Sequence, residues 1–514
     1  MLCSCYFSRL PMQNGTRLAA VDLGSNSFRL EIGQLDHGQI HRTEYLKETV
    51  RQGSGLDADR NLSADAMQRG WDCLARFGER LSGFKPTEVR AVATQTLREA
   101  RNRDVFLSRA CEILGFQIDV ISGREEARLI YQGVAHMLPQ SDERRLVVDI
   151  GGRSTELILG QHLTAQVMES FRVGSVAWSM KYFPNGQLTA SAFNMAEIAA
   201  KAVLDEALNA YPRNAWDVAY GSSGTMGAVA DVLAAAGWPA TTVTRDGLEW
   251  LVEKLIKAQH CDRVRLEGLK EDRRAVIGGG VSVLRAVFDL LSIDHLHPAQ
   301  GALRHGALYD LLDRENDQAD LRSSSVKRLA SNFGVDVLQA TRVTKVASNL
   351  FSQLLSSMQT SSGDAIQLLR KVDWAAQLHE IGCQISHSEY HKHGAYILDN
   401  ADASGFDLPE LHRLSMLVLG HRGKLKKLDA ELENATFMHQ LLALRLAVIL
   451  CHARRDIDIK GLQLTVSPGS KRQFILTCPT SWAQLLPQSV HLLREETLAW
   501  QKTNWSLVLH GCDV

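Results

Sequence analysis

Two short segments each place an aspartate at the end of an apolar run and follow it with glycine and small polar residues. They are VDLGSNSFRL (21–30) and VVDIGGRSTEL (147–157). Glycine lets a backbone approach a ligand, and successive N–H groups can form a concave anion site. One such loop also fits an ordinary hairpin turn. Two matching loops about one domain apart favour a phosphate site in each of two lobes.

Carboxylates flank both loops. Asp22 and Asp149 end their strands, and Glu156 lies on the strand that leaves the second loop. Carboxylates beside a phosphate repel it unless a cation pairs with them, and Mg²⁺ fits best because it prefers oxygen ligands. The sequence therefore predicts Mg²⁺ ligands among Asp22, Asp149 and Glu156. The alternative is that the two aspartates only cap turns.

Two adjacent glutamates begin a helix expected from about residue 123. Ser122 and Glu125 fit the S-x-x-E capping box. On a helical wheel Glu125 shares a face with Arg128 that we expect to be solvated, whereas Glu126 lies at the margin of the apolar stripe. Partial desolvation raises the pKa of a carboxyl and makes it a better base. We predict that Glu126 is the general base that activates water; the alternative is a half-buried glutamate paired with an arginine.

The elements that must position these residues alternate between helices and strands. Residues 63–81 and 105–114 have helical spacing, and residues 89–93 form a strand pattern between them. This alternation predicts an α/β sheet in each lobe. A further strand and glycine turn lies at 218–225. The glycine cluster at 278–280 is similar to the adenosine loop of actin-like ATPases, which leaves nucleotide binding open.

The remainder of the chain has a different pattern. A polar stretch at 314–325 is typical of a linker, and residues 326–455 are nearly all helical in pattern. The last segment predicts three strands and one helix, at 462–466, 473–476, 505–509 and 489–501. The predicted domains are 15–140 (lobe I), 141–313 (lobe II), 314–458 (helical) and 459–514 (small α+β).

Composition restricts the class of protein. The 514 residues are 45% hydrophobic and 22% charged, with a net charge of -1, so nothing global indicates nucleic-acid binding. Nine cysteines without CxxC pairs favour a reduced, cytoplasmic protein. No apolar run reaches the ~18–20 residues of a membrane span, so we expect no integral membrane contact; weak peripheral association stays open.

Six segments taken together resemble the exopolyphosphatase / guanosine pentaphosphate phosphohydrolase family of the duplicated, actin-like two-lobed fold. The segments are VDLGSNSFRL (21–30), ATQTLREA (93–100), SGREEARLIYQG (122–133), VVDIGGRSTEL (147–157), RVGSV (172–176) and GSSGT (221–225). The C-terminal part resembles the long exopolyphosphatase form, in which WAAQLHEIG (374–382), HKHGAYIL (391–398) and LGHRGK (419–424) are similar to a degenerate HD-type helical domain.

The resemblance implies roles for matching residues. The catalytic glutamate falls on Glu126, and the acidic residues that act with magnesium fall on Asp149 and Glu156. Phosphate binding falls on Gly24, Ser25, Asn26, Ser27, Arg98, Gly151, Gly152, Arg153, Ser154, Gly174, Ser223, Gly224 and Thr225. Arg153 replaces a usual third glycine, so its side chain either adds a phosphate contact or crowds the loop. The resemblance also implies a homodimer.

The helical domain lacks a complete HD ligand set. The expected His-Asp pair is His379-Glu380, and no histidine lies between His305 and His379, so we predict no catalytic metal there. A compact basic run follows in an otherwise nearly neutral chain. We predict that it holds distal polyphosphate, with a solvated turn as the alternative; its residues are His421, Arg422, Lys424, Lys426 and Lys427.

These patterns lead us to expect a Mg²⁺-dependent exopolyphosphatase, a phosphoanhydride hydrolase that removes terminal phosphates from inorganic polyphosphate. Three alternatives stay open. Guanosine pentaphosphate is the rival substrate, because the motifs do not separate the two activities. A polyphosphate- or nucleotide-binding regulator without turnover and an ATP-dependent kinase of the same fold are the others.

Overall fold

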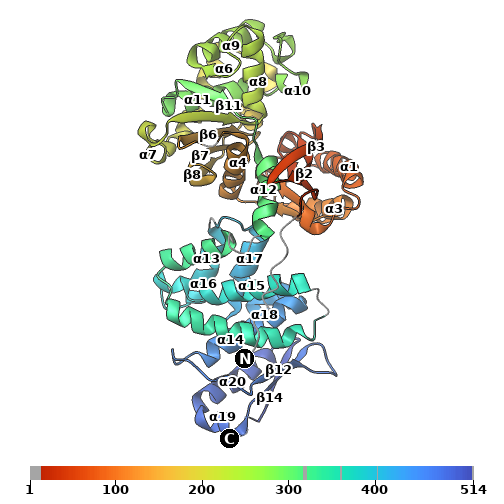
Figure 1. Cartoon of the computed structure of the whole chain (residues 1–514), viewed down its shortest axis with the longest axis vertical. Coiled ribbons are helices and arrows are strands. Elements are labelled where there is room, and N and C mark those ends of the chain that lie inside the picture. Colours follow the sequence, from red (N-terminus) through yellow and green to blue (C-terminus); the bar gives the residue numbers. More distant parts are fainter. Residues whose placement is uncertain (1–12, 140, 316–320, 359–361, 402, 512–514) are drawn as a thin grey trace. The chain divides into compact units, whose positions relative to one another are not determined.

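The computed structural model describes residues 13–139, 141–315, 321–358, 362–401 and 403–511. The chain divides into two compact units, Met1–Asp320 and Leu321–Val514 (Figure 1). Both predicted phosphate loops lie in the first unit.

The first sheet of this unit has the strand order β3-β2-β1-β4-β5. β1 is antiparallel to β2 and parallel to β4, so the first loop joins a hairpin at the centre of the sheet. The strands are β1 (Arg17–Leu23), β2 (Phe28–Asp36), β3 (Gln39–Glu48), β4 (Val89–Ala93) and β5 (Ile118–Val120).

The second sheet repeats this arrangement in the order β10-β11-β9-β6-β7-β8. β6 is antiparallel to β7 and parallel to β9, as β1 is to β2 and β4, which confirms the predicted duplication. The strands are β6 (Arg144–Ile150), β7 (Thr155–Gln161), β8 (Thr164–Phe171), β9 (Val218–Ser222), β10 (Val243–Thr244) and β11 (His295–Pro298).

Helices surround both sheets. The predicted helices at 63–81 and 105–114 are confirmed as α1 and α3, and the Ser63 hydroxyl caps α1 by accepting a bond from the Ala66 N–H. The helices of this unit are α1 (Ala64–Arg80), α2 (Gln95–Glu99), α3 (Arg103–Leu114), α4 (Gly123–Met137), α5 (Ser175–Tyr182), α6 (Ala190–Leu204), α7 (Ala207–Ala210), α8 (Ser223–Ala235), α9 (Arg245–Ala258), α10 (Glu271–Arg274), α11 (Ile277–Leu290) and α12 (Leu303–Glu315).

The glycine cluster at 278–280 lies inside α11 and does not form a nucleotide loop. A Cβ on Gly279 would lie 2.5 Å from the Ser175 carbonyl oxygen, and one on Gly280 would lie 2.6 Å from the Thr225 side chain. The glycines therefore let α11 pack closely on its neighbours, and none of the three lines the cleft described below. The cluster is helical and not a loop, and a role in nucleotide binding stays a prediction.

The second unit is mainly helical and ends in a three-stranded sheet with the order β12-β13-β14. Its helices are α13 (Leu321–Asn332), α14 (Val337–Leu355), α15 (Ser362–Leu378), α16 (Tyr390–Asn400), α17 (Leu408–Gly420), α18 (Ala435–Leu450), α19 (Thr480–Leu485) and α20 (Pro487–Trp500). Its strands are β12 (Gln463–Val466), β13 (Gln473–Thr477) and β14 (Ser506–His510). The expected strands and the helix near the C-terminus are confirmed within two residues.

One hydrophobic core extends through this unit, from Val326 on α13 to Leu507 on β14. The helices and the small sheet therefore stabilise each other. The predicted linker at 314–325 is wrong where the structure describes it, since residues 314–315 end α12 and residues 321–325 begin α13; residues 316–320 lie outside the described part.

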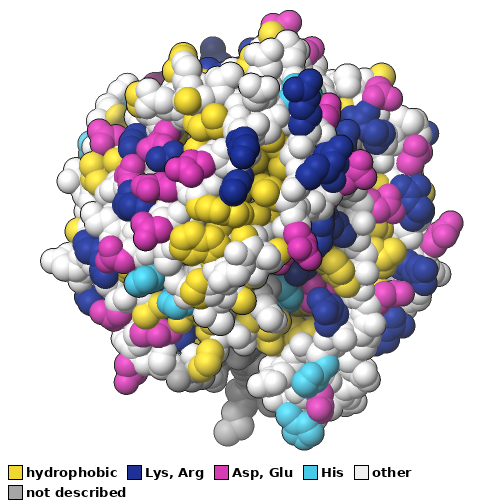
Figure 2. Space-filling view, turned by 90° about the horizontal axis from the view of Figure 1, so that it is seen from above, with side chains coloured by type: hydrophobic (Ala, Val, Ile, Leu, Met, Phe, Trp, Pro, Cys, Tyr) yellow, Lys and Arg dark blue, Asp and Glu magenta, His cyan; other side chains and the backbone are white. Residues whose placement is uncertain are grey.

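No helix in the described ranges is long and apolar enough to cross a membrane. On the face drawn in Figure 2, acidic and basic side chains are interspersed, and hydrophobic side chains gather near the middle.

Candidate active site

A cleft of about 350 Å³ in the first unit brings the predicted loops together. It is lined by residues of both sheets and of the helices that follow them. From the predicted set, the lining contains Asp22, Gly24, Ser25, Asn26, Ser27, Glu126, Asp149, Gly151, Gly152, Ser154, Ser223 and Gly224.

The first loop joins β1 to β2. A Cβ on Gly24 would lie 2.9 Å from the Ser27 carbonyl oxygen, so this tight turn requires glycine. The Ser25 hydroxyl accepts a hydrogen bond from Thr96 at 2.7 Å. Arg29 donates to Asp22 at 3.0 Å across the hairpin. The aspartate of the first loop therefore already has a cationic partner.

The second loop joins β6 to β7 and closes on itself through a 2.9 Å bond from the Gly151 N–H to the Ser154 carbonyl. A Cβ on Gly152 would lie 2.9 Å from the Ser25 Cβ. Glycine at 152 thus allows the loops of the two lobes to approach each other directly, which places both around one ligand position.

The third loop leads into α8. Ser223 has a φ of 84°, in the left-handed region, and its hydroxyl donates to the Ile150 carbonyl at 2.8 Å. The Thr225 hydroxyl donates to the same carbonyl at 2.9 Å. These bonds fix the N-terminus of α8, whose N–H groups favour anions, beside the second loop. Thr225 is a support for the loop and does not line the cleft.

Glu126 lies in the first turn of α4 and is 7% exposed. Burial raises the pKa of its carboxyl to about 7, against the opposing effect of Arg98, which donates to Glu126 Oε2 at 3.0 Å. A carboxyl with a pKa near neutrality is suited to general-base chemistry. The structure shows that Glu126 is paired with an arginine and lines the cleft. Its role as the general base stays a prediction.

Arg98 is directed at the protein, and its side chain does not line the cleft. It also donates to the Ile121 carbonyl at 2.7 Å and to the Gln95 side chain. In this arrangement Arg98 orients Glu126. The expected bidentate contact with a phosphate stays a prediction.

Asp149 and Glu156 lie opposite each other on β6 and β7. Burial raises the pKa of Asp149 to about 6. Burial, followed by the charges of Glu126 and Asp149, raises the pKa of Glu156 well above its ordinary value. Glu156 accepts a bond from Ser170 with one oxygen, while Oε2 is buried without a hydrogen-bond partner. A group of clustered carboxyls with an unbonded oxygen fits a hard cation.

The carboxylates do not form a closed metal cage. Among the described residues, three ligand atoms converge within 4.8 Å only at His260, Cys261 and Asp262, which do not line the cleft. Mg²⁺ commonly takes one or two carboxylates together with waters and substrate phosphates. Asp149, which lines the cleft, fits that role; Glu156 lies behind the lining, and Asp22 is bonded to Arg29.

Two further predicted phosphate ligands, Arg153 and Gly174, do not line the cleft. The Arg153 guanidinium bonds Glu99 at 3.0 Å and the Gly53 carbonyl at 3.1 Å, so it neither crowds the loop nor lines the cleft. A Cβ on Gly174 would lie 2.6 Å from the Arg153 backbone nitrogen. Gly174 is needed for backbone packing behind the second loop.

Sequence reasoning missed the cations of the cleft, because they are distant in sequence from the loops. They are Arg29, Lys47, Lys270, Arg273 and Arg304. Only Arg29 lies within a recognised motif. Arg273 is 8% exposed, and its Nη2 atom would lie 2.1 Å from a Cβ on Gly224. Among the described residues, no carboxylate lies within ion-pair distance of it.

The predicted solvated face of α4 is wrong. Glu125 is fully buried and makes two bonds to Arg128, at 2.8 and 2.9 Å. Arg128 also pairs with Asp310 of α12. The helical wheel could not show that α12 covers this face. The Ser122 half of the predicted capping box is confirmed, since the Ser122 hydroxyl accepts a bond from the Glu125 N–H.

The basic run of the second unit is only partly exposed. His421 is 2% exposed and bonds the Val418 carbonyl, and burial lowers its pKa well below the ordinary value. It is therefore neutral and cannot be a surface anion ligand. Lys427 is half-buried, whereas Arg422, Lys424 and Lys426 are exposed; their role in anion binding stays a prediction.

Two duplicated sheets with paired strand–loop–strand motifs around one cleft define an actin-like fold. The chain belongs to the Ppx/GppA phosphatase family: the family profile matches residues 32–315, and the profile of the family's domain III matches residues 321–499. A solved exopolyphosphatase from Cytophaga hutchinsonii ATCC 33406 is 25% identical, with a TM-score of 0.52, and covers 58% of this chain and 98% of its own.

Full-length relatives carry a different name. The chain is 38% identical over 491 residues to a guanosine-5'-triphosphate,3'-diphosphate pyrophosphatase of Vibrio atlanticus (strain LGP32), covering 95% of this chain and 97% of the relative. A protein of the same name from Vibrio cholerae serotype O1 is 39% identical over the same length, with the same coverage.

These relatives overturn the expected exopolyphosphatase activity. The similarity extends through the helical part, so the long C-terminal extension, which favoured polyphosphate, does not separate the two activities. The catalytic loops do not separate them either, because both reactions cleave a terminal phosphoanhydride. The rival interpretation, a guanosine pentaphosphate phosphohydrolase, is the better supported one.

Proposed function

We propose that this protein hydrolyses the terminal 5'-phosphate of guanosine 5'-triphosphate,3'-diphosphate and releases orthophosphate. The observation that carries the proposal is the cleft itself, where a buried base with a pKa of about 7 adjoins three loops suited to phosphate. The names of relatives that match nearly the whole chain support the choice of nucleotide.

In the proposed reaction Glu126 accepts a proton from water, and the water oxygen attacks the terminal phosphorus. The new P–O bond forms as the phosphoanhydride bond to the next phosphate breaks, and that phosphate leaves as the end of a diphosphate. Backbone N–H groups and hydroxyls of the loops bind the transferred phosphoryl group, where positioning and electrostatics dominate catalysis. Arg98 holds Glu126 in place during proton transfer.

Mg²⁺ fits this site as a cofactor. Asp149 would hold it together with phosphate oxygens, and it would neutralise charge on the transferred phosphoryl group. The buried, unbonded Glu156 Oε2 supports a positive charge nearby. Asp22 contributes less, because Arg29 already occupies its carboxylate.

The cations of the cleft suit the other phosphates of the nucleotide. Arg273 is the strongest candidate, since its guanidinium is largely buried, lies against Gly224 and can bind a phosphate with two donors. Arg273→Gln should raise KM for the nucleotide by about tenfold or more, with a smaller effect on kcat. Arg274→Gln on the same helix is the matched control, because Arg274 does not line the cleft.

The decisive experiment measures phosphate release from guanosine pentaphosphate, GTP and long polyphosphate, each with and without Mg²⁺. The proposal predicts fast, Mg²⁺-dependent release from guanosine pentaphosphate and much slower release from the polymer. Equal or faster release from the polymer would contradict the proposed substrate. No release from any of the three would contradict hydrolysis altogether.

Resemblance, cysteine usage and local charge also support several broader proposals. We propose a degenerate HD-like helical domain and a small C-terminal domain within the second unit, a homodimeric protein and a cytoplasmic location. Anion binding by Arg422, Lys424, Lys426 and Lys427 belongs with these, supported by their exposure or partial exposure. Size-exclusion chromatography with light scattering would test the dimer.

A further inference from the structure

Two helices connect the lobes of the first unit, and each packs on the sheet of the other lobe. α4 follows the first sheet in the chain but packs on β7 and β8 of the second, whereas α12 follows the second sheet and packs on β1 and β4 of the first. The two lobes of the first unit are therefore joined through these helices. Glu126, the proposed base, lies in the first turn of α4.

The two helices approach each other through glycine. A Cβ on Gly306 would lie 1.8 Å from the Leu129 carbonyl oxygen, and one on Gly133 would lie 2.2 Å from the Ala302 carbonyl oxygen. No larger residue fits at either crossing. The helix backbones are in direct contact there, so the position of α12 strongly influences the position of α4.

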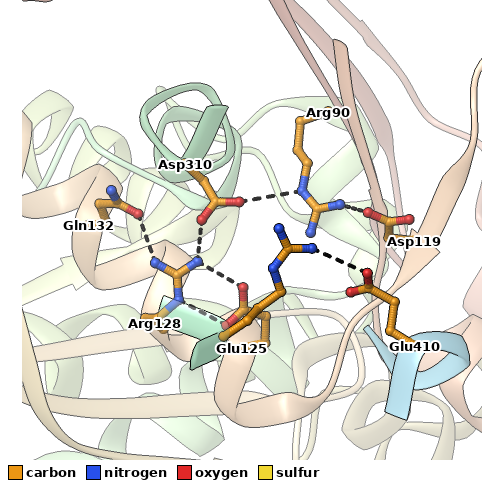
Figure 3. Close-up of polar contacts among 8 residues, drawn as sticks. Arg90, Asp119, Glu125, Arg128, Gln132, Asp310 and Glu410 are labelled. Carbon is orange, nitrogen blue, oxygen red and sulfur yellow. Dashed lines mark hydrogen bonds and ion pairs between the residues drawn. The ribbon is translucent and has the colours of Figure 1, made fainter. Parts of the chain in front are cut away.

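A buried charge network fixes the first turn of α4 to α12 and to the first sheet (Figure 3). Asp310 of α12 has one oxygen 2.5 Å from Arg128 Nη2 and the other 3.6 Å from Arg90 Nε. Arg90 on β4 also pairs with Asp119 on β5. Asp310 therefore joins α12 to both α4 and the sheet.

Arg128 connects Asp310 to Glu125, the residue next to the proposed base Glu126. Its guanidinium binds both oxygens of Glu125 and also donates to Gln132 at 3.1 Å. Glu125 is fully buried, and the Asp310 side chain is 4% exposed. Glu125 and Glu126 point to different sides of α4: Glu125 faces this network, and Glu126 faces the cleft and Arg98.

We infer that Asp310, acting through Arg128 and Glu125, is a positioning residue that sets the location of Glu126 in the cleft. None of Asp310, Arg128 and Glu125 lines the cleft. Loss of Asp310 should therefore impair the chemical step and leave nucleotide binding largely intact. The inference rests on the proposed role of Glu126 in nucleotide hydrolysis.

The test is a double-mutant cycle with Asp310→Asn and Glu126→Gln, assayed by phosphate release from guanosine pentaphosphate with Mg²⁺. Asp310→Asn keeps the shape of the side chain and removes its charge. A displaced base should lower kcat about 10- to 100-fold, while KM stays within about twofold because the ligand contacts are on other elements. In the Glu126→Gln background, Asp310→Asn should have almost no further effect on single-turnover rates.

A merely structural role gives a different pattern. It would lower kcat equally in both backgrounds, or raise KM in parallel, and either result would overturn the inference, as would an unchanged kcat. Asp217→Asn is the control, since it removes an Asp–Arg pair at the surface of the second sheet and should leave kcat unchanged.

If Asp310→Asn does not fold, Arg128→Lys replaces it in the cycle, because lysine keeps the charge and loses the two-pronged contact with Glu125. A folded Arg128→Lys protein with wild-type kcat would then overturn the inference. Failure of the proposed function would appear in the wild-type enzyme, as absence of phosphate release. Failure of this inference would appear only when kcat and KM of the variants are compared with those of the wild-type enzyme.

Discussion

The two strand–loop–strand units share a backbone but differ in charge at one equivalent position. In the β1–β2 hairpin Asp22 lies opposite Arg29, and in the β6–β7 hairpin Asp149 lies opposite Glu156. The first aspartate is thus neutralised within its own hairpin at 3.0 Å. The second faces another carboxyl, and burial raises the pKa of both. Duplication has produced one self-neutralised loop and one that favours a proton or a cation.

The largest expected effect concerns Glu126, which adjoins both loops. Glu126→Gln should lower kcat by about 10²–10⁴-fold, because the amide cannot accept the proton of the attacking water. Nucleotide affinity, measured by calorimetry with the unhydrolysed substrate, should change little since both loops remain. Glu253→Gln, an exposed residue of α9, is the control. Turnover near the wild-type value in the Glu126 variant would exclude it as the base.

The two aspartates should differ when each is replaced by asparagine. Asp149→Asn should lower kcat about 10²–10³-fold and raise the Mg²⁺ concentration needed for half-maximal rate. Asp22→Asn should cost about tenfold or less, since Arg29 already compensates its charge. Initial rates across a Mg²⁺ titration provide the measurement. Equal losses in the two variants would show that the loops are functionally symmetric.

Replacing Asp149 or Asp22 should change the free energy of unfolding with a different dependence on pH. The pKa of Asp149 is raised to about 6 in the folded protein, so its stabilising contribution is complete below the unfolded value near 3.8 and is lost as pH rises through about 6. Without Mg²⁺, the free energy of unfolding of Asp149→Asn should therefore rise by about 1–3 kcal/mol relative to that of wild type as the pH increases from 4 to 8.

Asp22→Asn is the contrast for this measurement. It removes a largely buried ion pair with Arg29, so it should be destabilised at neutral pH without a comparable gain. Thermal unfolding of both variants across the pH range gives the comparison. A flat difference between Asp149→Asn and wild type would contradict the raised pKa.

The smallest expected effect is that of Arg153, the side chain that most visibly distinguishes the second loop. Arg153→Gly should change kcat and KM by no more than about twofold, because its guanidinium contacts Glu99 and Gly53 and contributes at most a partly exposed ion pair. Steady-state kinetics on guanosine pentaphosphate suffice. A tenfold rise in KM would place Arg153 among the phosphate ligands after all.

Much of the fold and the centre of the site could be predicted, because local patterns encode them. Strand, glycine turn and strand are contiguous in sequence, so the loops at 24–27 and 151–154 and the duplication followed from them. Glu126 followed from its place on one helix. The expected substrate was wrong because polyphosphate and guanosine pentaphosphate end in the same phosphoanhydride, and the recognised motifs surround that shared end.

By itself, the sequence determined which residues could do chemistry: two loop aspartates, a glutamate at the start of a helix and the glycines that let backbones approach. Tertiary structure decided what each of them faces. It paired Asp22 with Arg29, turned Arg98 and Arg153 toward protein partners, buried Glu125 under α12 and brought Lys47, Arg273 and Arg304 to the cleft. The physical reason is that charge and burial depend on neighbours distant in sequence, which no local pattern specifies.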